Sequence, residues 1–348
     1  MSWNPFKTRQ SSTDSASSVF QRTVIEDRGR SQFDALHALL QQEEAPGELG
    51  TVGRYELRTI LGEGGLGTVY GAWDPLLSRR VAVKMLKQQV VDEAPATAGV
   101  PSAAELTLNE ARAAARLSHP HIVTVFDAGA SPQGIYIAME TLQGMDLRQL
   151  LRQGWRPNPQ EAASLVRRVA EALAYAHGKG VIHCDIKPAN IFMVDRRMPK
   201  VLDFGIARLA RGDGSAVQAA SIGSPHYLSP EQLRQQPIDR RCDVYSLGVV
   251  LFELLTGRAP YTGRSMEEIT EAVLTAPQPV ACQWNPQAPD GLSAIAAQAM
   301  ARNPSARFPS ARHMANALRD WKHSQDPDLE ATQPIRRGLF AWLRGHRG

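Results

Sequence analysis

The order of apolar and polar positions along the chain predicts a strand-rich first part and a helical second part. Short segments rich in Val, Ile and Tyr, such as YELRTILG and RRVAVKML, are separated by Gly and Asp-Pro turns, which is typical of strands. The predicted strands cover residues 55–62, 68–73, 79–86, 121–129 and 134–140. Helical spacing of apolar residues predicts helices over residues 105–117, 161–177 and 243–257. Strands followed by helices favour an α+β fold of two lobes.

The two ends of the chain differ from the segment between them. Residues 1–30 are polar and Ser-rich, so we expect them to be disordered, and residues 31–44 have the spacing of one short amphipathic helix. The predicted organisation is a flexible segment with one helix, a folded domain with a small and a large lobe, and a polar linker with a basic amphipathic tail. Their boundaries are residues 1–53, 54–320 (lobes 54–141 and 142–320) and 321–348.

Composition and charge exclude several classes of protein. Of the 348 residues, 43% are hydrophobic and 21% charged, and the formal charge is only +4, which is typical of a soluble globular protein. No basic run is interleaved with aromatic residues, so we expect no nucleic-acid binding. Three cysteines without metal-ligand spacing argue against a disulfide framework or a structural zinc site. Because neither a signal peptide nor a long apolar run is evident, a cytoplasmic location is predicted.

A glycine-rich motif lies between the first two predicted strands. Gly62, Gly64 and Gly67 form a G-x-G-x-x-G pattern, which Val69 follows. Glycine lets backbone N–H groups approach phosphates closely because no Cβ stands in the way. Alone the motif is a weak signal, since a plain glycine-rich hairpin turn fits it equally well. Its position between two strands argues against a dinucleotide-binding unit, and the P-loop pattern is absent from the sequence.

Lys84 ends an apolar strand, where a charged side chain needs a partner. Alternation places Ala82 and Lys84 on the same face of the strand. An inward charge among apolar residues is costly unless it is paired. Glu110, on the helix that follows, is the candidate partner, and an ordinary exposed helical glutamate is the alternative.

Two polar segments carry the candidate chemistry. HCDIKPAN contains Asp185, Lys187 and Asn190, and VLDFGIAR follows with Asp203. Carboxylate and amide oxygens suit Mg²⁺, so Asn190 and Asp203 can hold the metal, while Asp185 can orient a hydroxyl group and accept its proton. Any one of these residues alone would be read as a surface acid or a helix cap. Together, in this order, they predict phosphoryl transfer.

In this order the motifs resemble those of bacterial eukaryotic-type (Hanks-type) serine/threonine protein kinases, over residues 54–320. The resemblance implies the two-lobed protein-kinase fold, with ATP in the cleft and Mg²⁺ or Mn²⁺ as cofactor. It implies that Lys84, held by Glu110, positions the phosphates of ATP. The residues implied to bind ATP are Leu61, Gly62, Gly64, Gly67, Val69, Ala82, Lys84, Glu110, Met139, Glu140, Leu142 and Asp146.

The run IYIAMETLQGMDL resembles the hinge of these kinases. The resemblance implies that Met139 is the gatekeeper and that Glu140 and Leu142 bind adenine through their backbone. Asp146 is implied to lie near the ribose.

Further parts of the resemblance concern structure and specificity. Lys187, two residues after Asp185, marks serine/threonine specificity in the family, so the implied reaction transfers the γ-phosphoryl group to a Ser or Thr of a protein. SPHYLSPE resembles the segment that ends in A-P-E, and it implies that Glu231 pairs with Arg307. Asp243 resembles the buried aspartate that braces the catalytic loop.

Cys184 departs from the family, which usually has arginine at this position of the catalytic loop. That arginine binds a phosphate on the activation loop through charge-assisted bonds, which a thiol cannot replace. We therefore hypothesise a kinase that does not require activation-loop phosphorylation. The loop contains no Thr; Ser215 and Ser221 are candidate phosphorylation sites, and Ser224 is predicted to have a structural or substrate-positioning role. Whether Cys184 is redox-sensitive depends on the pKa and the exposure of its thiol, which a sequence does not show.

The flanks contain further candidate sites. Thr23 and Thr332 lie in polar segments, and Ile335 stands three residues after Thr332. A phosphothreonine followed by an apolar residue at that spacing resembles ligands of FHA domains, so autophosphorylation there would recruit a phosphothreonine-reading partner. An unmodified solubilising linker is the alternative. The basic tail fits either a short helix on an acidic membrane surface or docking on the large lobe.

Two other classes of function remain open. Every group that the family needs for chemistry is present, which favours an active enzyme over a nucleotide-binding pseudokinase scaffold. A small-molecule phosphotransferase of the same fold is the second alternative, and Lys187 and the SPHYLSPE segment argue against it.

Overall fold

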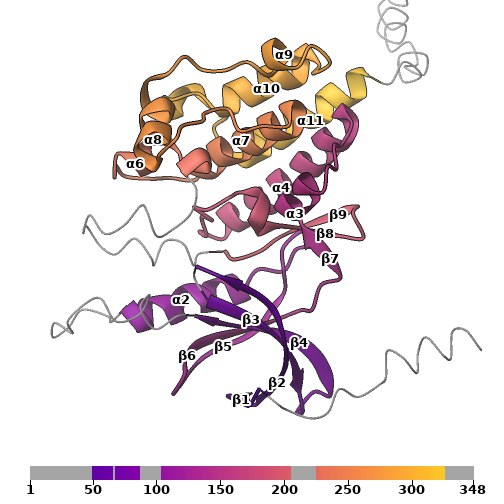
Figure 1. Cartoon of the computed structure of the whole chain (residues 1–348), viewed down its shortest axis with the longest axis vertical. Coiled ribbons are helices and arrows are strands. Elements are labelled where there is room, and N and C mark those ends of the chain that lie inside the picture. The colour runs from indigo at the N-terminus through magenta and orange to yellow at the C-terminus, as the bar shows by residue number, and fades with distance from the viewer. Residues whose placement is uncertain (1–48, 66, 87–102, 205–224, 326–348) are drawn as a thin grey trace, which may run out of the picture. The chain divides into compact units, whose positions relative to one another are not determined.

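The structure is a computed structural model that describes residues 49–65, 67–86, 103–204 and 225–325 (Figure 1). The predicted N-terminal helix, the basic tail and five residues singled out above lie outside the described residues. Those residues are Thr23, Ser215, Ser221, Ser224 and Thr332. Among the described residues, no helix has both the length and the apolar character that crossing a membrane requires.

The first part of the described chain forms a six-stranded antiparallel sheet in the order β1-β2-β3-β4-β6-β5. The strands are β1 (Thr51–Val52), β2 (Tyr55–Gly64), β3 (Gly67–Asp74), β4 (Arg79–Leu86), β5 (Val125–Ser131) and β6 (Gly134–Met139). Helix α2 (Ala103–Ala115) packs along β5 and β6 (Figure 1). Because β1 pairs with β2, the sheet begins within the segment 1–53 that was expected to be flexible.

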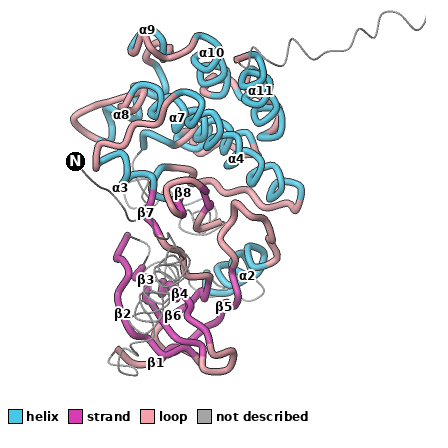
Figure 2. Tube along the Cα trace, turned by 90° about the vertical axis from the view of Figure 1, so that its right-hand side faces the viewer, coloured by secondary structure: helices cyan, strands magenta, loops and turns pink. Residues whose placement is uncertain are grey.

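The second part is mainly helical and surrounds one large apolar core. Its helices are α3 (Leu147–Arg152), α4 (Pro159–Gly178), α6 (Pro230–Leu233), α7 (Arg241–Thr256), α8 (Met266–Thr275), α9 (Ala281–Trp284), α10 (Asp290–Ala299) and α11 (Ala311–Ser324). A small antiparallel sheet consists of β7 (Gly144–Asp146), β8 (Ile191–Val194) and β9 (Met198–Val201). Figure 2 shows the described helices, apart from α2, confined to this second part. The predicted α+β fold of two lobes is confirmed.

Local signals set the ends of two central helices. In the capping box of α4, Asn158 Oδ1 accepts from Glu161 N and Asn158 N donates to Glu161 Oε2, each at 2.9 Å. Helix α7 ends at Gly257, whose φ of 77° is a left-handed conformation that glycine adopts without strain. Almost every residue of α7 is buried, because the helix packs against α4, α10 and α11. Its continuous apolar pattern reflects this central position.

The run 121–129, predicted as one strand, is divided in the structure. Strand β5 begins only at Val125, while Ile122 bridges Val201 of β9 in a parallel sense. Val123 N donates to Val201 O at 3.0 Å. The first residues of the run therefore connect the two lobes, and their apolar character reflects burial at that contact. Strands β7, β8 and β9 were not predicted, since each has only three or four residues.

A buried ion pair ties α6 to the segment before α11. Arg307 Nη1 and Nη2 donate to Glu231 Oε1 and Oε2, each at 2.7 Å, and the two side chains are 0% and 8% exposed. Arg307 also donates to the carbonyl oxygens of Ala301, Arg241 and Arg302, so all five guanidinium N–H groups are used. Burial raises the pKa of Glu231, but the hydrogen bonds from Arg307 outweigh it and hold this pKa below its usual value.

Removing the cation of this pair should destabilise the protein strongly. We expect Arg307→Ala to lower the free energy of unfolding by about 3–5 kcal/mol, because Glu231 is left buried and charged without its partner. Urea denaturation followed by circular dichroism measures the change. Folding lowers the pKa of Glu231, so the ion pair stabilises the folded state fully at pH values above about 4.3, the pKa of a glutamate in the unfolded chain. The difference between wild type and variant should therefore shrink as the pH falls below that value.

The matched control is Arg241→Ala. Arg241 pairs with Asp239 at 2.6 Å, but both side chains are partly exposed, at 31% and 51%. Exposed pairs contribute only about 0–1 kcal/mol, so this variant should unfold almost as wild type does. If Arg307→Ala and Arg241→Ala lowered the free energy of unfolding equally, the buried pair would not be the stabilising one.

Candidate active site

Three predicted catalytic residues converge in the loop that follows α4. Asp185 Oδ2 accepts hydrogen bonds from Lys187 Nζ at 2.6 Å and from Asn190 Nδ2 at 2.9 Å. Asn190 Nδ2 also donates to the backbone oxygen of Asp185 at 2.8 Å. Residues Pro188–Asn190 form a 3₁₀ turn that leads into β8 and brings the amide back to the carboxylate.

A fully buried carboxylate on α7 fixes this loop. Asp243 accepts hydrogen bonds from the backbone N–H groups of His183 at 2.9 Å and of Cys184 at 2.7 Å. His177 Nε2 on α4 lies 2.8 Å from the same carboxylate. Burial raises the pKa of Asp243, but the hydrogen bond with His177 and its charge outweigh burial and hold this pKa below its usual value. Asp243 was predicted at this position, whereas no sequence motif indicated His177.

His183 connects the catalytic loop to the segment that carries Asp203. Its Nε2 lies 2.7 Å from the backbone oxygen of Leu202, and its Nδ1 accepts from Asp185 N at 3.2 Å. The ring packs edge-on against Phe204, with centroids 4.7 Å apart. The two polar segments recognised in the sequence are therefore in direct contact.

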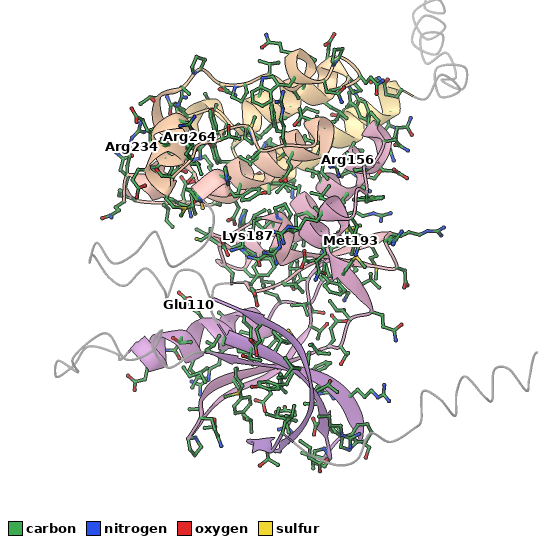
Figure 3. The ribbon with its side chains drawn as sticks, viewed as in Figure 1. Glu110, Arg156, Lys187, Met193, Arg234 and Arg264 are labelled. Carbon is green, nitrogen blue, oxygen red and sulfur yellow. The ribbon has the colours of Figure 1, made fainter. Side chains whose placement is uncertain are left out.

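An ion pair joins the two lobes at this place. Lys84 lies opposite Val69 of β3 and Ile137 of β6, and it is only 6% exposed. Its Nζ lies 2.7 Å from Asp203 Oδ2. Burial raises the pKa of Asp203, but the charge of Lys84 outweighs it, so this pKa stays below its usual value and the carboxylate is ionised at neutral pH. Glu110 lies on α2 (Figure 3), and its pairing with Lys84 stays a prediction.

The three glycines of the glycine-rich motif differ in their surroundings. A Cβ on Gly67 would collide with the backbone oxygen of Met85, so packing against β4 requires glycine there. A Cβ on Gly62 would meet no described atom within 4 Å, and one on Gly64 would meet only the Gly67 oxygen at 3.9 Å. Packing among the described residues therefore does not require glycine at these two positions. It leaves them open to the close approach of a phosphate.

The predicted hinge is held to both lobes. Met139 ends β6 and Leu142 packs against the same apolar cluster. Glu140 N donates to Thr124 O at 2.9 Å, and Glu140 Oε1 accepts from Thr124 N at 2.7 Å and from Lys200 Nζ of β9 at 2.6 Å. Burial raises the pKa of Glu140, but the Lys200 hydrogen bond and further contacts outweigh it and lower this pKa. No pattern in the sequence predicted the contact between Lys200 and Glu140.

The remaining residues of the predicted nucleotide site have mixed surroundings. Val69 and Ala82 belong to the apolar cluster that includes Met139, whereas Leu61 on β2 is 55% exposed. Asp146 also caps α3, because its Oδ1 accepts from Gln149 N at 2.8 Å. Asp146 therefore has a structural role as the cap of α3, in addition to its predicted role at the ribose.

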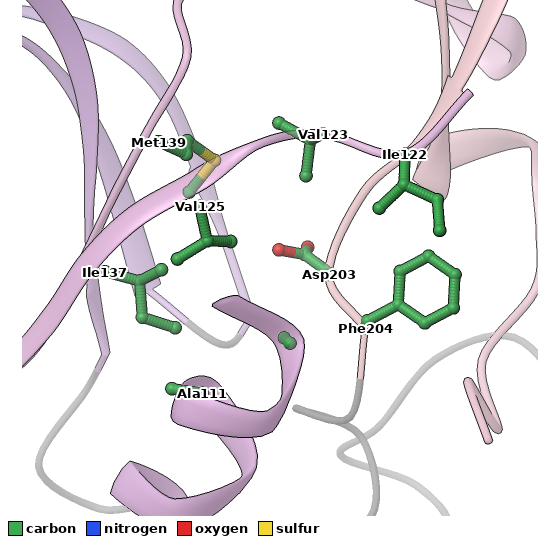
Figure 4. Close-up of a pocket in the computed structure, with 9 residues that line it drawn as sticks. Ala111, Ile122, Val123, Val125, Ile137, Met139, Asp203 and Phe204 are labelled. Carbon is green, nitrogen blue, oxygen red and sulfur yellow. The ribbon is translucent and has the colours of Figure 1, made fainter. Parts of the chain in front are cut away.

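A small cavity lies behind the ion pair. Its volume of about 20 Å³ has room for about one water molecule. It is lined by Ala111, Ala114, Ile122, Val123, Val125, Ile137, Met139, Asp203 and Phe204. Figure 4 shows the Asp203 carboxylate pointing into this cavity. Both lobes and α2 therefore meet around Asp203.

Asn190 and Asp203 carry donors that fit a divalent metal. Leu202 N donates to the Asn190 backbone oxygen at 2.9 Å, which places the two segments side by side. The described side-chain hydrogen bonds of Asn190 use Nδ2, so its Oδ1 can act as a metal ligand, as can the ionised Asp203 carboxylate. Amide and carboxylate oxygens are the ligands that Mg²⁺ and Mn²⁺ accept.

The segment SPHYLSPE, which resembles the one ending in A-P-E, supports the catalytic loop from another side. Ser229 begins α6 with a capping box, and Gln232 Nε2 donates to the backbone oxygen of Cys184 at 2.9 Å. Tyr227 OH donates to Glu253 Oε2 of α7 at 2.6 Å. Sequence reasoning missed both the Gln232 and the Tyr227 contacts, because they join residues far apart in the chain.

Comparisons with known proteins agree with this geometry. The protein kinase domain model matches residues 55–318. A probable serine/threonine-protein kinase of Corynebacterium efficiens is 40% identical over 275 residues, covering 76% of this chain and 41% of that protein. PrkC of Bacillus subtilis is 35% identical over 292 residues (81% and 44%), and PknD of Mycobacterium tuberculosis is 37% identical over 292 residues (84% and 43%); both are serine/threonine-protein kinases. The chain thus spans less than half the length of these relatives.

A solved structure agrees with the fold. The crystal structure of Rad53 residues 1–466 in complex with AMP-PNP has a TM-score of 0.61 at 20% identity, and the match covers 76% of this chain and 64% of that one. With the matching family model and these bacterial relatives, the chain belongs to the protein kinase family, in the branch of the bacterial eukaryotic-type serine/threonine kinases.

Proposed function

We propose that this chain is an ATP-dependent serine/threonine protein kinase, which transfers the γ-phosphoryl group of ATP to a Ser or Thr hydroxyl of a protein. The observation that carries the proposal is the convergence of Lys187 and Asn190 on the Asp185 carboxylate, at 2.6 and 2.9 Å. The Lys84–Asp203 pair, which His183 and Phe204 connect to this loop, supplies the second half of a phosphoryl-transfer site.

Each catalytic side chain has a role that its charge and position support. Asp185 orients the acceptor hydroxyl and accepts its proton, while the neighbouring Lys187 stabilises negative charge on the transferred phosphoryl group. Lys84, buried at the lobe contact, positions the α- and β-phosphates. Mg²⁺ or Mn²⁺, held by Asn190 and Asp203, would neutralise the phosphate charge.

The nucleotide site is proposed to extend from the glycine-rich loop to the hinge. Gly62 and Gly64, where a Cβ would meet almost nothing among the described residues, let backbone N–H groups reach the phosphates. The backbones of Glu140 and Leu142 bind adenine, and Asp146 lies at the ribose. Apolar side chains enclose the adenine ring: Leu61, Val69, Ala82 and Met139.

We further propose that the site is organised without a phosphate on the activation loop. Cys184 is 1% exposed and has no cationic group, so it offers nothing that binds a phosphate through a charge-assisted bond. The backbone of Cys184 is instead held by Asp243 and Gln232, at 2.7 and 2.9 Å. These two contacts need no modification of the activation loop.

The first prediction concerns turnover. Asp185→Asn should reduce phosphate transfer by about 10²–10⁴-fold, because the amide does not accept the hydroxyl proton. Transfer from labelled ATP, with Mg²⁺ or Mn²⁺ and a generic basic protein as acceptor, measures the loss. Asp239→Asn, which changes only an exposed pair, is the matched control and should keep full activity. An inactive wild type that still binds ATP would favour the pseudokinase scaffold, and transfer to small alcohols alone would favour a small-molecule phosphotransferase.

The second prediction concerns the activation loop. Replacing Ser215 and Ser221 together by Ala should leave phosphate transfer within about twofold of wild type, since no guanidinium at position 184 reads a phosphate there. The rates of the double variant and of phosphatase-treated wild type are compared. A loss of activity in both samples would overturn the proposal of loop-independent activation.

The third prediction concerns the flanks. Incubation of the full chain with ATP should add phosphate to Thr23 or Thr332, as located by peptide mapping, and Asp185→Asn should abolish it. A phosphorylated Thr332, with Ile335 after it, would recruit a partner of the FHA type. Flanks that stay unmodified while a protein substrate is phosphorylated would refute this route. Contact of the tail with a membrane or with the large lobe stays a prediction.

A further inference from the structure

Two of the three cysteines meet beneath the catalytic loop. Cys184 belongs to the loop and Cys242 to α7, and they are 1% and 0% exposed. Both residues lie against the same oxygen, because Asp243 Oδ1 is 3.8 Å from Cys242 Sγ and 2.7 Å from Cys184 N. The third cysteine, Cys282 of α9, is partly exposed, and its backbone N–H donates to Ser293 Oγ at 3.0 Å. The fold therefore brings together one particular pair of thiols.

This thiol pair is attached to the brace of the catalytic loop. Cys242 Sγ lies 3.8 Å from Asp243 Oδ1, the same oxygen that accepts from Cys184 N at 2.7 Å. Cys184 has a φ of 66°, a left-handed conformation that is uncommon for a residue with a side chain. Its position is fixed on both sides, because Gln232 Nε2 donates to its backbone oxygen at 2.9 Å. The catalytic candidate Asp185 is the next residue.

We propose that Cys184 and Cys242 form a dithiol site that a hydroperoxide, such as hydrogen peroxide, converts reversibly into an intramolecular disulfide. In the first step the sulfur of one cysteine attacks the peroxide, the O–O bond breaks, and a sulfenic acid and water form. In the second step the neighbouring thiol attacks this sulfur, the S–O bond breaks, and a second water leaves with the thiol proton. Two thiols are oxidised by two electrons in total and one peroxide is reduced to two waters. A thiol reductant restores the dithiol by exchange.

The surroundings of Cys242 disfavour its thiolate. A hydrogen bond with Cys184, burial and the nearby Asp243 carboxylate raise the pKa of the Cys242 thiol well above its usual value. Because the thiolate is the reactive form, Cys242 reacts slowly with a peroxide. Burial makes the reaction slow and admits only a small oxidant.

The consequence for activity rests on the proposed kinase function. Closing the disulfide draws the two sulfurs to about 2.05 Å, closer than any hydrogen-bonded contact of thiols. The backbone N–H and C=O of Cys184 are held by Asp243 and Gln232. A pull on the Cys184 sulfur therefore strains these contacts and displaces the backbone of the next residue, Asp185. A misplacement of about 1 Å in a catalytic group can cost about 10²-fold in rate. We therefore expect the oxidised form to transfer phosphate at least about tenfold more slowly, and the reductant to restore the rate.

The test uses the full chain with Cys282→Ser, so that Cys184 and Cys242 are its only thiols. The protein is treated with hydrogen peroxide, and its fold is checked by circular dichroism. Thiols are then counted with a thiol reagent in denaturant, and non-reducing peptide mapping locates any link. We expect the two thiols to disappear, the mass to fall by about two hydrogen atoms, and one peptide pair to join positions 184 and 242.

Single variants supply the matched controls. In the same background, Cys184→Ser and Cys242→Ser each retain one thiol and should form no intramolecular link. Two intact thiols in the treated Cys282→Ser protein, or conversion of either cysteine to sulfinic acid without a link, would overturn the proposal. The link is measured without catalysis, so a chain without kinase activity would not affect this result. A link that forms while the rate stays unchanged would overturn the regulatory consequence.

Discussion

The buried carboxylate of Asp243 is the interaction on which the candidate site depends. An ionised group that is removed from water is costly unless hydrogen bonds replace its hydration. Asp243 receives them from the backbone of His183 and Cys184 and from the ring of His177. The carboxylate comes from α7, the helix at the centre of the core. The catalytic loop is therefore positioned against a helix whose residues are almost all buried.

From this anchor a chain of contacts reaches the other lobe. His183, held through its backbone, packs against Phe204, and Phe204 follows Asp203 directly. Asp203 then pairs with Lys84 of the small-lobe sheet at 2.7 Å. Its left-handed φ of 60° is uncommon for a residue with a side chain, and it is maintained where the carboxylate meets the ammonium group. Helix α7 thus positions the Lys84–Asp203 ion pair indirectly, through the contacts of His183 and Phe204.

The sequence predicted most of what depends on local pattern. Strands β2, β3, β4 and β6, the helices α2, α4 and α7, and the polar segments with Asp185 and Asp203 all follow from periodicity or motif. What it missed depends on contacts between distant residues. The run from residue 121 looked like one strand, because burial at a lobe contact and burial in a sheet give the same apolar pattern. Likewise nothing in the sequence distinguishes Lys200 or His177 from ordinary surface residues, since their partners Glu140 and Asp243 are sixty or more residues away.

The side chain of residue 184 is not needed for the hydrogen bonds that hold the catalytic loop. The hydrogen bonds that position residue 184 use its backbone N–H and C=O, which any side chain leaves in place. An arginine at this position would direct a charge toward a phosphate, whereas the thiol is 1% exposed and contacts Cys242 of α7. The absence of a guanidinium here agrees with the proposal that the site is organised without a phosphate on the activation loop. The proximity of Cys242 agrees with the proposal that the oxidation state of two thiols is the chemical variable at this position.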